Sequence, residues 1–130
     1  MPRFSANLSL LFTELPFLER FSAAREYGFL AVEIQFPYET PAEHIKTQID
    51  LTGLELVLIN VPTGDLMNGG EGLAAVPSKR QEFIDSVNKA AEYADILRPK
   101  FINVLPGCCF EIDCLDQYMA TFISNLGHVA

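Results

Sequence analysis

The chain has 130 residues, 49% of them hydrophobic, and a formal net charge of −8 at pH 7. This length and apolar content fit one globular domain and exclude a disordered segment. The acidic balance argues against nucleic acid and anionic membranes as partners, because both carry negative charge themselves.

Strand and helix patterns alternate at the start of the chain. Apolar residues alternate between Ser5 and Leu11, which predicts a short strand with Asn7 on its other parity. Apolar residues then recur at helical spacing from Pro16 to Gly28, where the glycine suits a left-handed cap. Phe29 to Phe36 predicts a second strand, and Glu33 on its inner parity needs a partner because an unpaired buried carboxylate is costly.

The third strand has the most apolar pattern of the chain. A capping box that starts at Thr40 predicts the beginning of the helix before it. The strand runs from Leu54 to Pro62 and is apolar on both parities, which is typical of a parallel strand covered on both faces. Asn60 shares its parity with Leu56 and Leu58. Because ligands of parallel α/β folds bind at the carboxyl ends of strands, we expect Asn60 to face the site.

A long glycine-rich segment, Thr63 to Pro77, follows the third strand and contains the acids Asp65 and Glu71. Its place after a strand predicts a binding loop or a mobile lid, and a surface loop with solvated acids is the alternative. A second capping box at Ser78 predicts the next helix, and Lys100 to Leu105 predicts the fourth strand.

The end of the chain contains the cysteines and a last helix. Three cysteines lie between Cys108 and Cys114, and this odd, crowded set does not make a disulfide framework. Vicinal cysteines also cannot easily reach one zinc ion, so we expect buried thiols in a cytoplasmic protein. The apolar run before residue 13 is too short for a membrane span and lacks a signal-peptide cleavage site. Asp113 is expected to cap the last helix, whose apolar positions are Leu115, Met119, Phe122, Leu126 and Val129.

Together these patterns predict an α/β fold of four βα units, forming a single domain over residues 1–130. Such alternation specifies a parallel sheet with right-handed crossovers. Either half of a (β/α)8 barrel or a small open sheet would satisfy it. The barrel is favoured because a helix follows every strand and polar residues gather at strand ends. An open sheet of flavodoxin type would need helices on both faces and a phosphate loop.

Polar residues on these strands are the candidates for a site. Asn7, Asn60 and Asn103 could offer amide donors to a polyol or keto acid, and the alternative is that they anchor loops. Glu33 and Gln35 could bind a substrate hydroxyl or orient a metal ligand. The alternative for Glu33 is a structural carboxylate paired with a cation inside the sheet.

Three segments carry a resemblance to a known family: PRFSANLSLLFTELPFLERFSAAREYGF, VEIQFPY and INVPTGDLMNGGEGLAAVP. They resemble the amino-terminal half of hydroxypyruvate isomerases, cytosolic members of the xylose-isomerase-like TIM-barrel superfamily. The resemblance extends from Pro2 to Ala130. It implies a (β/α)8 barrel that interconverts hydroxypyruvate and tartronate semialdehyde, an aldose–ketose type isomerisation in carbohydrate metabolism. In such enzymes a divalent cation polarises the oxygens while paired glutamates move a proton.

The same resemblance implies where this chemistry is located. The superfamily's metal ligands and catalytic glutamates come from strands five to eight, whereas the pattern here ends after a fourth helix. We therefore assign no catalytic and no metal-binding residue within this chain, and we expect the ligands of the implied divalent metal elsewhere. Asn7, Glu33, Asn60 and Glu71 are the predicted substrate-binding residues, for a small hydroxy or keto acid or a sugar-like substrate.

Two functions remain open at this point. The chain is expected either to belong to an isomerase that is inactive without its other half, or to be a non-catalytic, dimeric half-barrel for binding or structure. Half a barrel leaves two open sheet edges, which predicts a homo-oligomer that covers them. The end at Ala130 is consistent with a disrupted reading frame, a fragment or a natural half-barrel.

Overall fold

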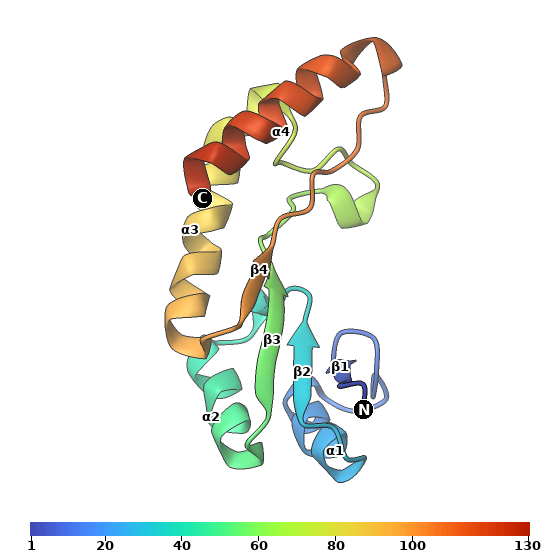
Figure 1. The fold of residues 1–130 in the computed structure, drawn as a ribbon, viewed down its shortest axis with the longest axis vertical. Helices are drawn as coiled ribbons and strands as arrows, with labels where there is room; N and C mark the ends of the chain where they lie inside the picture. Colours follow the sequence, from blue (N-terminus) through green and yellow to red (C-terminus); the bar gives the residue numbers. More distant parts are fainter. The chain divides into compact units, whose positions relative to one another are not determined.

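The structure is a computed structural model that describes residues 1–130 (Figure 1). The chain divides into two compact units. Unit 1 comprises Met1–Asn60 and Ala90–Asn103, and unit 2 comprises Val61–Lys89 and Val104–Ala130. The single domain expected from the sequence stays a prediction.

Unit 1 contains the whole sheet. Its four strands are β1 (Ser5–Asn7), β2 (Ala31–Ile34), β3 (Glu55–Asn60) and β4 (Phe101–Asn103). They are ordered β1-β2-β3-β4, and each neighbouring pair is parallel. The predicted parallel sheet is therefore confirmed. Its sequential order fits a section of a barrel, because a doubly wound sheet reverses its strand order at a switch point.

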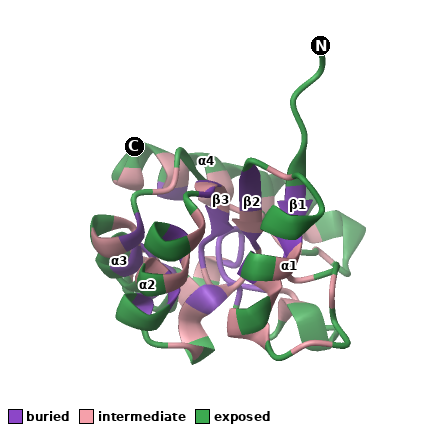
Figure 2. Cartoon of the chain, turned by 90° about the horizontal axis from the view of Figure 1, so that it is seen from below, coloured by how far each residue is buried: buried purple, intermediate pink, exposed green.

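The helices of unit 1 pack on one face of this sheet. They are α1 (Arg20–Glu26), α2 (Ala42–Thr52) and the end of α3 (Arg80–Leu97). Figure 2 shows the buried segments of β1, β2 and β3 in purple. The core joins strand and helix residues: Ala6, Leu8, Val32, Ile34, Leu54, Leu56 and Ile59 from the sheet and its ends, and Phe21, Ala24, Ile45, Ile49, Tyr93 and Leu97 from the helices.

A β-bulge changes the parity of β3. Val32 pairs with Leu56 but Glu33 pairs with Leu58, so one extra residue, Val57, is inserted between the pairs. Leu56 is therefore buried toward the helices, whereas Leu58 aligns with Glu33 on the other face. The expectation that Leu56 and Leu58 share a face is wrong, because one extra residue moves every later side chain to the opposite face.

Unit 2 has a smaller core around the start of α3 and α4 (Leu115–Val129). The core consists of Leu73, Ala74 and Phe83, with Val87, Val104, Phe122 and Val129 packed against it. The predicted stripe on α4 is correct only in its second half, because Leu115 and Met119 are exposed. Asn125 is buried instead, since its Nδ2 donates to the Ala74 carbonyl at 2.8 Å.

The predicted side-chain caps at the helix amino ends are wrong, whereas Gly28 after α1 has the expected positive φ, 90°. α2 begins after Pro41 with no side-chain cap, and the carbonyl of Thr40 instead accepts a 2.7 Å hydrogen bond from the Tyr93 hydroxyl. Short 3-10 turns, Pro77–Lys79 and Ile112–Cys114, lead directly into α3 and α4. A 3-10 turn supplies backbone partners at a helix end, so a side-chain cap from Ser78 or Asp113 is not needed there. None of the helices is both long and apolar enough to cross a bilayer.

Candidate functional site

The face of the sheet opposite the helices carries a row of polar side chains in unit 1. Strand pairing aligns Asn7 with Glu33 and Leu58. Two residues further toward the carboxyl ends, it aligns Asn60 with Asn103. We call Asn7, Glu33, Asn60 and Asn103 the polar row. Because parallel strands share one direction, the structure brings these predicted residues to the same end of one sheet face.

Asn60 is held in place by three backbone and side-chain hydrogen bonds. Asn60 is only 7% exposed, and its Oδ1 accepts a hydrogen bond from Asn103 Nδ2 at 3.1 Å. Its backbone N–H donates to the Gln35 carbonyl at 2.9 Å, and its carbonyl accepts from the Tyr38 hydroxyl. These bonds fix the backbone and the side-chain oxygen of Asn60. They therefore also fix the direction of the two N–H donors of its side-chain amide.

A pair of tyrosines behind Asn60 escaped the sequence analysis. The rings of Tyr38 and Tyr93 pack edge to face with centroids 5.0 Å apart. Burial, with a smaller contribution from Tyr93, raises the pKa of Tyr38 far above its ordinary value of 10.0. Tyr38 therefore stays protonated and remains a donor to Asn60 at physiological pH. The only signal in the sequence was its place directly after the second strand, in VEIQFPY.

Asn7 shapes the loop that follows β1. Its Oδ1 accepts a 2.9 Å hydrogen bond from the backbone N–H of Ser9, and the Ser9 hydroxyl accepts one from the N–H of Gln35, also at 2.9 Å. Arg20 of α1 donates to the Leu8 carbonyl at 2.9 Å. This arrangement is an Asx turn, so the loop-anchor role is present in the structure. A substrate role for the remaining Asn7 amide group stays a prediction.

Glu33 lies beside Asn7 on the neighbouring strand and is half-buried. Ion pairs in the structure include those of Arg3 and Lys100 with Glu55, of Lys46 with Asp50, and of Lys79 with Asp65. No cation pairs with the Glu33 carboxylate, so the structural alternative of a cation within the sheet is not seen. Its role as a substrate ligand stays a prediction.

Glu71 belongs to unit 2, where the loop and α4 hold it. The Tyr118 hydroxyl donates to Glu71 Oε1 at 2.8 Å, and this hydrogen bond is the main reason that the pKa of Tyr118 rises to about 12. The Glu71 carbonyl accepts from the backbone N–H of Cys108 at 2.9 Å. Gly107 lies so close to it that an added Cβ would be 2.1 Å from the Glu71 carbonyl oxygen. Glu71 is therefore positioned both through its carboxylate and through its backbone carbonyl.

Asp65 organises the same loop. Its Oδ1 accepts the backbone N–H of Gly72 at 3.0 Å, and Lys79 Nζ lies 3.6 Å from its Oδ2. The Gly72 N–H, followed by the charge of Lys79, lowers the pKa of Asp65 below 3.8. A Cβ at Gly70 would be 2.0 Å from the Asp65 carboxyl carbon. Asp65 is therefore a solvent-exposed acid, as the alternative expects, and its carboxylate also closes the turn.

The structure holds no group of three or more His, Cys, Asp or Glu side chains that could bind a metal ion. The residues present therefore do not fit the divalent metal that the resemblance implies, and we assign no chemical step to a metal in this chain. The cysteines are free, with Cys108 exposed and Cys109 and Cys114 half-exposed. The expectation of buried thiols is wrong, because the segment before α4 is mostly exposed.

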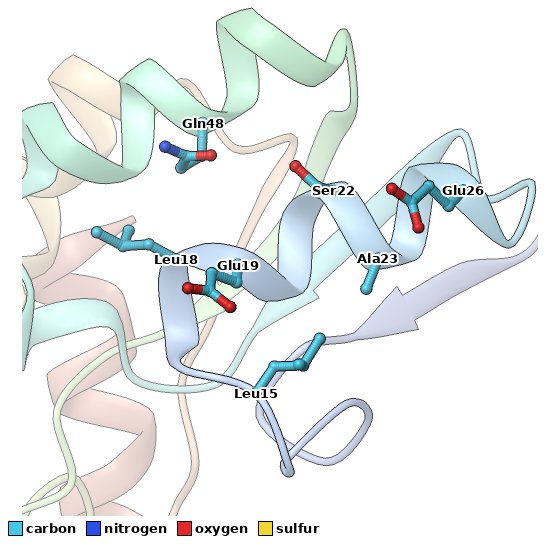
Figure 3. A pocket seen from close by; sticks show the side chains of 7 residues that line it. All are labelled: Leu15, Leu18, Glu19, Ser22, Ala23, Glu26 and Gln48. Atoms are coloured by element: carbon cyan, nitrogen blue, oxygen red, sulfur yellow. The ribbon is translucent and has the colours of Figure 1, made fainter.

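A hollow of about 360 Å³ lies between α1 and α2, away from the polar row (Figure 3). Glu19, Ser22 and Glu26 line it from the side of α1, and Gln48 lines it from α2. None of the predicted site residues lines this hollow. It is a groove between two outer helices, and we assign it no role.

Comparisons with known proteins agree with this geometry. The family model described as xylose isomerase-like TIM barrel matches residues 21–130. The 2-oxo-tetronate isomerase of Haemophilus influenzae is 37% identical over 100% of this chain and 50% of its own length. The hydroxypyruvate isomerase of Escherichia coli K12 is 42% identical, again over 100% of this chain and 50% of its own length.

Two solved structures match as well. A structure titled AP endonuclease, family 2, from Brucella melitensis has a TM-score of 0.93 and 41% identity, and the match covers 99% of this chain and 50% of that chain. The apo 3-keto-D-glucoside 4-epimerase of E. coli has a TM-score of 0.69 at 18% identity, which supports the fold alone. The chain spans about half the length of the curated relatives it matches. Its four parallel strands and their helices match half of such a barrel, and the chain belongs to the xylose isomerase-like TIM-barrel family.

Proposed function

We propose that this chain forms a substrate-binding half of an isomerase that acts on hydroxypyruvate or a related 2-oxo acid. The polar row carries the proposal, because it gathers amide and carboxylate groups at the carboxyl ends of parallel strands, on the face without helices. Relatives at about 40% identity named hydroxypyruvate isomerase and 2-oxo-tetronate isomerase support the substrate class.

The groups of the polar row suit such a substrate. An aldose–ketose type isomerisation exchanges a carbonyl and a hydroxyl on neighbouring carbons, and a proton moves between those carbons. The amides of Asn60 and Asn103 donate to the carbonyl or carboxylate oxygens of the substrate, and the Glu33 carboxylate accepts from its hydroxyl. We place proton transfer and binding of a divalent metal in the half of the relatives that this chain does not match.

Isomerase activity tests this division of labour. The purified chain with hydroxypyruvate and added Mg²⁺ or Mn²⁺ should show no turnover. Turnover should appear when it is mixed with the separately produced, unmatched half of the E. coli hydroxypyruvate isomerase. Turnover by the chain alone would contradict the proposal, as would a mixture that stays inactive although circular dichroism shows both halves folded.

Substitution in the polar row refines the test. A hydrogen bond to a charged group contributes roughly 1.5–3 kcal/mol, so Asn60→Ala should lower kcat/KM of the mixture by about tenfold to a hundredfold. Asn88→Ala on the exposed part of α3 is the matched control and should leave kcat/KM unchanged. Equal activity of both variants would remove Asn60 from the substrate site.

We also propose a cytoplasmic location. The three free, partly exposed thiols support it, because such cysteines persist in reduced form in a reducing compartment. Fractionation of cells that produce the tagged chain should place it with cytosolic markers, and recovery with secreted proteins would contradict the proposal.

A further inference from the structure

The loop that follows Asn7 of the polar row is closed at both ends by one side chain. We call residues 8–15 the β1 loop. The Arg20 guanidinium of α1 donates through Nη1 to the Leu8 carbonyl at 2.9 Å and through Nε to the Leu15 carbonyl at 3.0 Å. These carbonyls belong to the first and last residues of the loop, so Arg20 joins its two ends. Arginine suits this task because its planar guanidinium holds several donors in a fixed geometry.

One residue of the β1 loop has a backbone conformation that its side chain disfavours. Phe12 has a φ of 60°, in the left-handed region that bulky residues rarely adopt. Its ring lies against that of Tyr27 with centroids 5.6 Å apart, and its carbonyl accepts from the Leu15 N–H at 2.9 Å. Such conformations persist only where the surroundings hold them, and they cluster at binding and catalytic sites. A loop that only connected β1 to α1 would not need this conformation.

The β1 loop also determines where the Asn7 side-chain amide points. Asn7 Oδ1 accepts from the Ser9 N–H at 2.9 Å, and the Ser9 hydroxyl accepts from the N–H of Gln35, which follows β2. The Asn7 carbonyl accepts from the N–H groups of Leu10 and Leu11 at 3.1 and 2.9 Å. No group of this chain accepts from Asn7 Nδ2, so its two N–H donors are available to a ligand while their direction is fixed.

We propose that Arg20 is a positioning residue of the substrate site. By closing the β1 loop, Arg20 keeps the Ser9 N–H on Asn7 Oδ1, and this bond holds the Asn7 Nδ2 donors ready for a substrate oxygen. Arg20 thus acts through Asn7 and not by contact with the substrate. This inference rests on the proposed function, because Asn7 belongs to the polar row that is proposed to bind the 2-oxo acid.

A positioning role and a purely structural role of Arg20 make different predictions. Donors that are already held in place bind more tightly, because less conformational freedom is lost when the ligand arrives. A purely structural Arg20 would change the stability of the fold and leave the substrate affinity of the folded chain unchanged. A positioning Arg20 changes that affinity, and only while the Asn7 amide is present.

Binding of hydroxypyruvate to the purified chain tests the proposal, with the side-chain amide signals of Asn7 and Asn60 followed by NMR. Arg20→Met removes the guanidinium and should raise the dissociation constant roughly threefold to tenfold, the loss of about one hydrogen bond. Arg25→Met, exposed in the last turn of the same helix, is the matched control and should leave it unchanged. Asn7→Ala should also raise it, and adding Arg20→Met to Asn7→Ala should raise it no further.

Further measurements separate loss of positioning from loss of the fold. Circular dichroism should show that each variant compared is folded. Arg20→Lys keeps the charge without the fork of donors and should raise the dissociation constant less than Arg20→Met. Whichever variants fold, hydrogen exchange of the wild type should show the Ser9 N–H protected before any substrate is added.

The outcomes also distinguish this inference from the proposed function. An unchanged dissociation constant in folded Arg20→Met would overturn the positioning role, as would a further rise when Arg20→Met is added to Asn7→Ala. Unprotected Ser9 in the wild type would overturn it too. In each of these cases saturable shifts of the Asn60 and Asn103 signals would leave the proposed function standing. If hydroxypyruvate moves no signal of the polar row, the proposed function fails and the positioning role fails with it.

Discussion

Glu71 and Tyr118 show how a single residue in this chain is positioned by a partner far away in the sequence. Glu71 stands in the glycine-rich loop and Tyr118 in α4, and their hydrogen bond is 2.8 Å long. The negative carboxylate stabilises the protonated phenol, which is why the pKa of Tyr118 rises to about 12. A folded-state pKa above the ordinary value of 10.0 means that this contact stabilises below pH 10 and is lost as the pH approaches 12.

This pair gives a test by titration. Glu71→Gln removes the charge that raises the pKa, so the Tyr118 phenol should titrate closer to 10.0 than in the wild type. The measurement is a pH titration of the ¹³Cζ signal of Tyr118 by NMR. Glu82→Gln in the first turn of α3 is the control and should leave the Tyr118 titration where it was. An unchanged Tyr118 pKa in Glu71→Gln would show that the Glu71 carboxylate does not cause the shift.

Glu33 and Asn60 illustrate what single residues of the sequence revealed. Both are polar residues within apolar strands, and burial without a partner would be costly, which made them stand out. The structure places them on one sheet face as expected. Tyr38 and Tyr118 gave no such signal, because aromatic residues fit any core and their hydroxyl partners come from distant segments.

At the scale of elements, the glycine-rich loop and the segment before α4 are tied together within unit 2. The N–H of Cys108 donates to the Glu71 carbonyl, and the N–H of Ala75 donates to the Pro106 carbonyl at 3.1 Å. Gly107 has a φ of 101°, which side chains rarely adopt, and it touches the Glu71 carbonyl closely. Backbone hydrogen bonds therefore hold the loop to the segment before α4 in this structure, and its predicted role as a binding loop or lid stays a prediction.

Substitution of Gly107 tests that junction. Gly107→Ala would place a Cβ 2.1 Å from the Glu71 carbonyl oxygen. Strain of this kind costs roughly 1–3 kcal/mol, so the urea midpoint of unfolding should fall. Gly127→Ala in α4 meets nothing within 4 Å and should be neutral or slightly stabilising, because alanine favours helix. If both variants unfold at the same urea concentration, the close approach at Gly107 is not what orders the loop.

Other features of the elements lay beyond a sequence pattern. Apolar periodicity was enough for the four strands and for the stripe of α1, because burial against a single face repeats regularly. The bulge at Val57 depends on how β3 pairs with β2, and pairing is not written in the residues of either strand. Asn125 is buried because Ala74 and Arg80 satisfy its amide, and these contacts come from other elements.

At the scale of the whole molecule, family membership and the polar row lead to one account. The chain matches half the length of the isomerases it resembles, and its sheet has open edges and a polar face at the carboxyl ends. Hydroxy and keto acids bind to such groups through their oxygens. The central claim is that this face of unit 1 contacts the substrate.

NMR of side-chain amides tests this claim most directly. Hydroxypyruvate titrated into the ¹⁵N-labelled chain should shift the amide signals of Asn60 and Asn103 in a saturable manner. The amide signal of Asn88, exposed on α3, should stay in place and serves as the internal control. Signals of the polar row that remain unmoved up to saturating substrate, or that move no more than the signal of Asn88, would contradict the account.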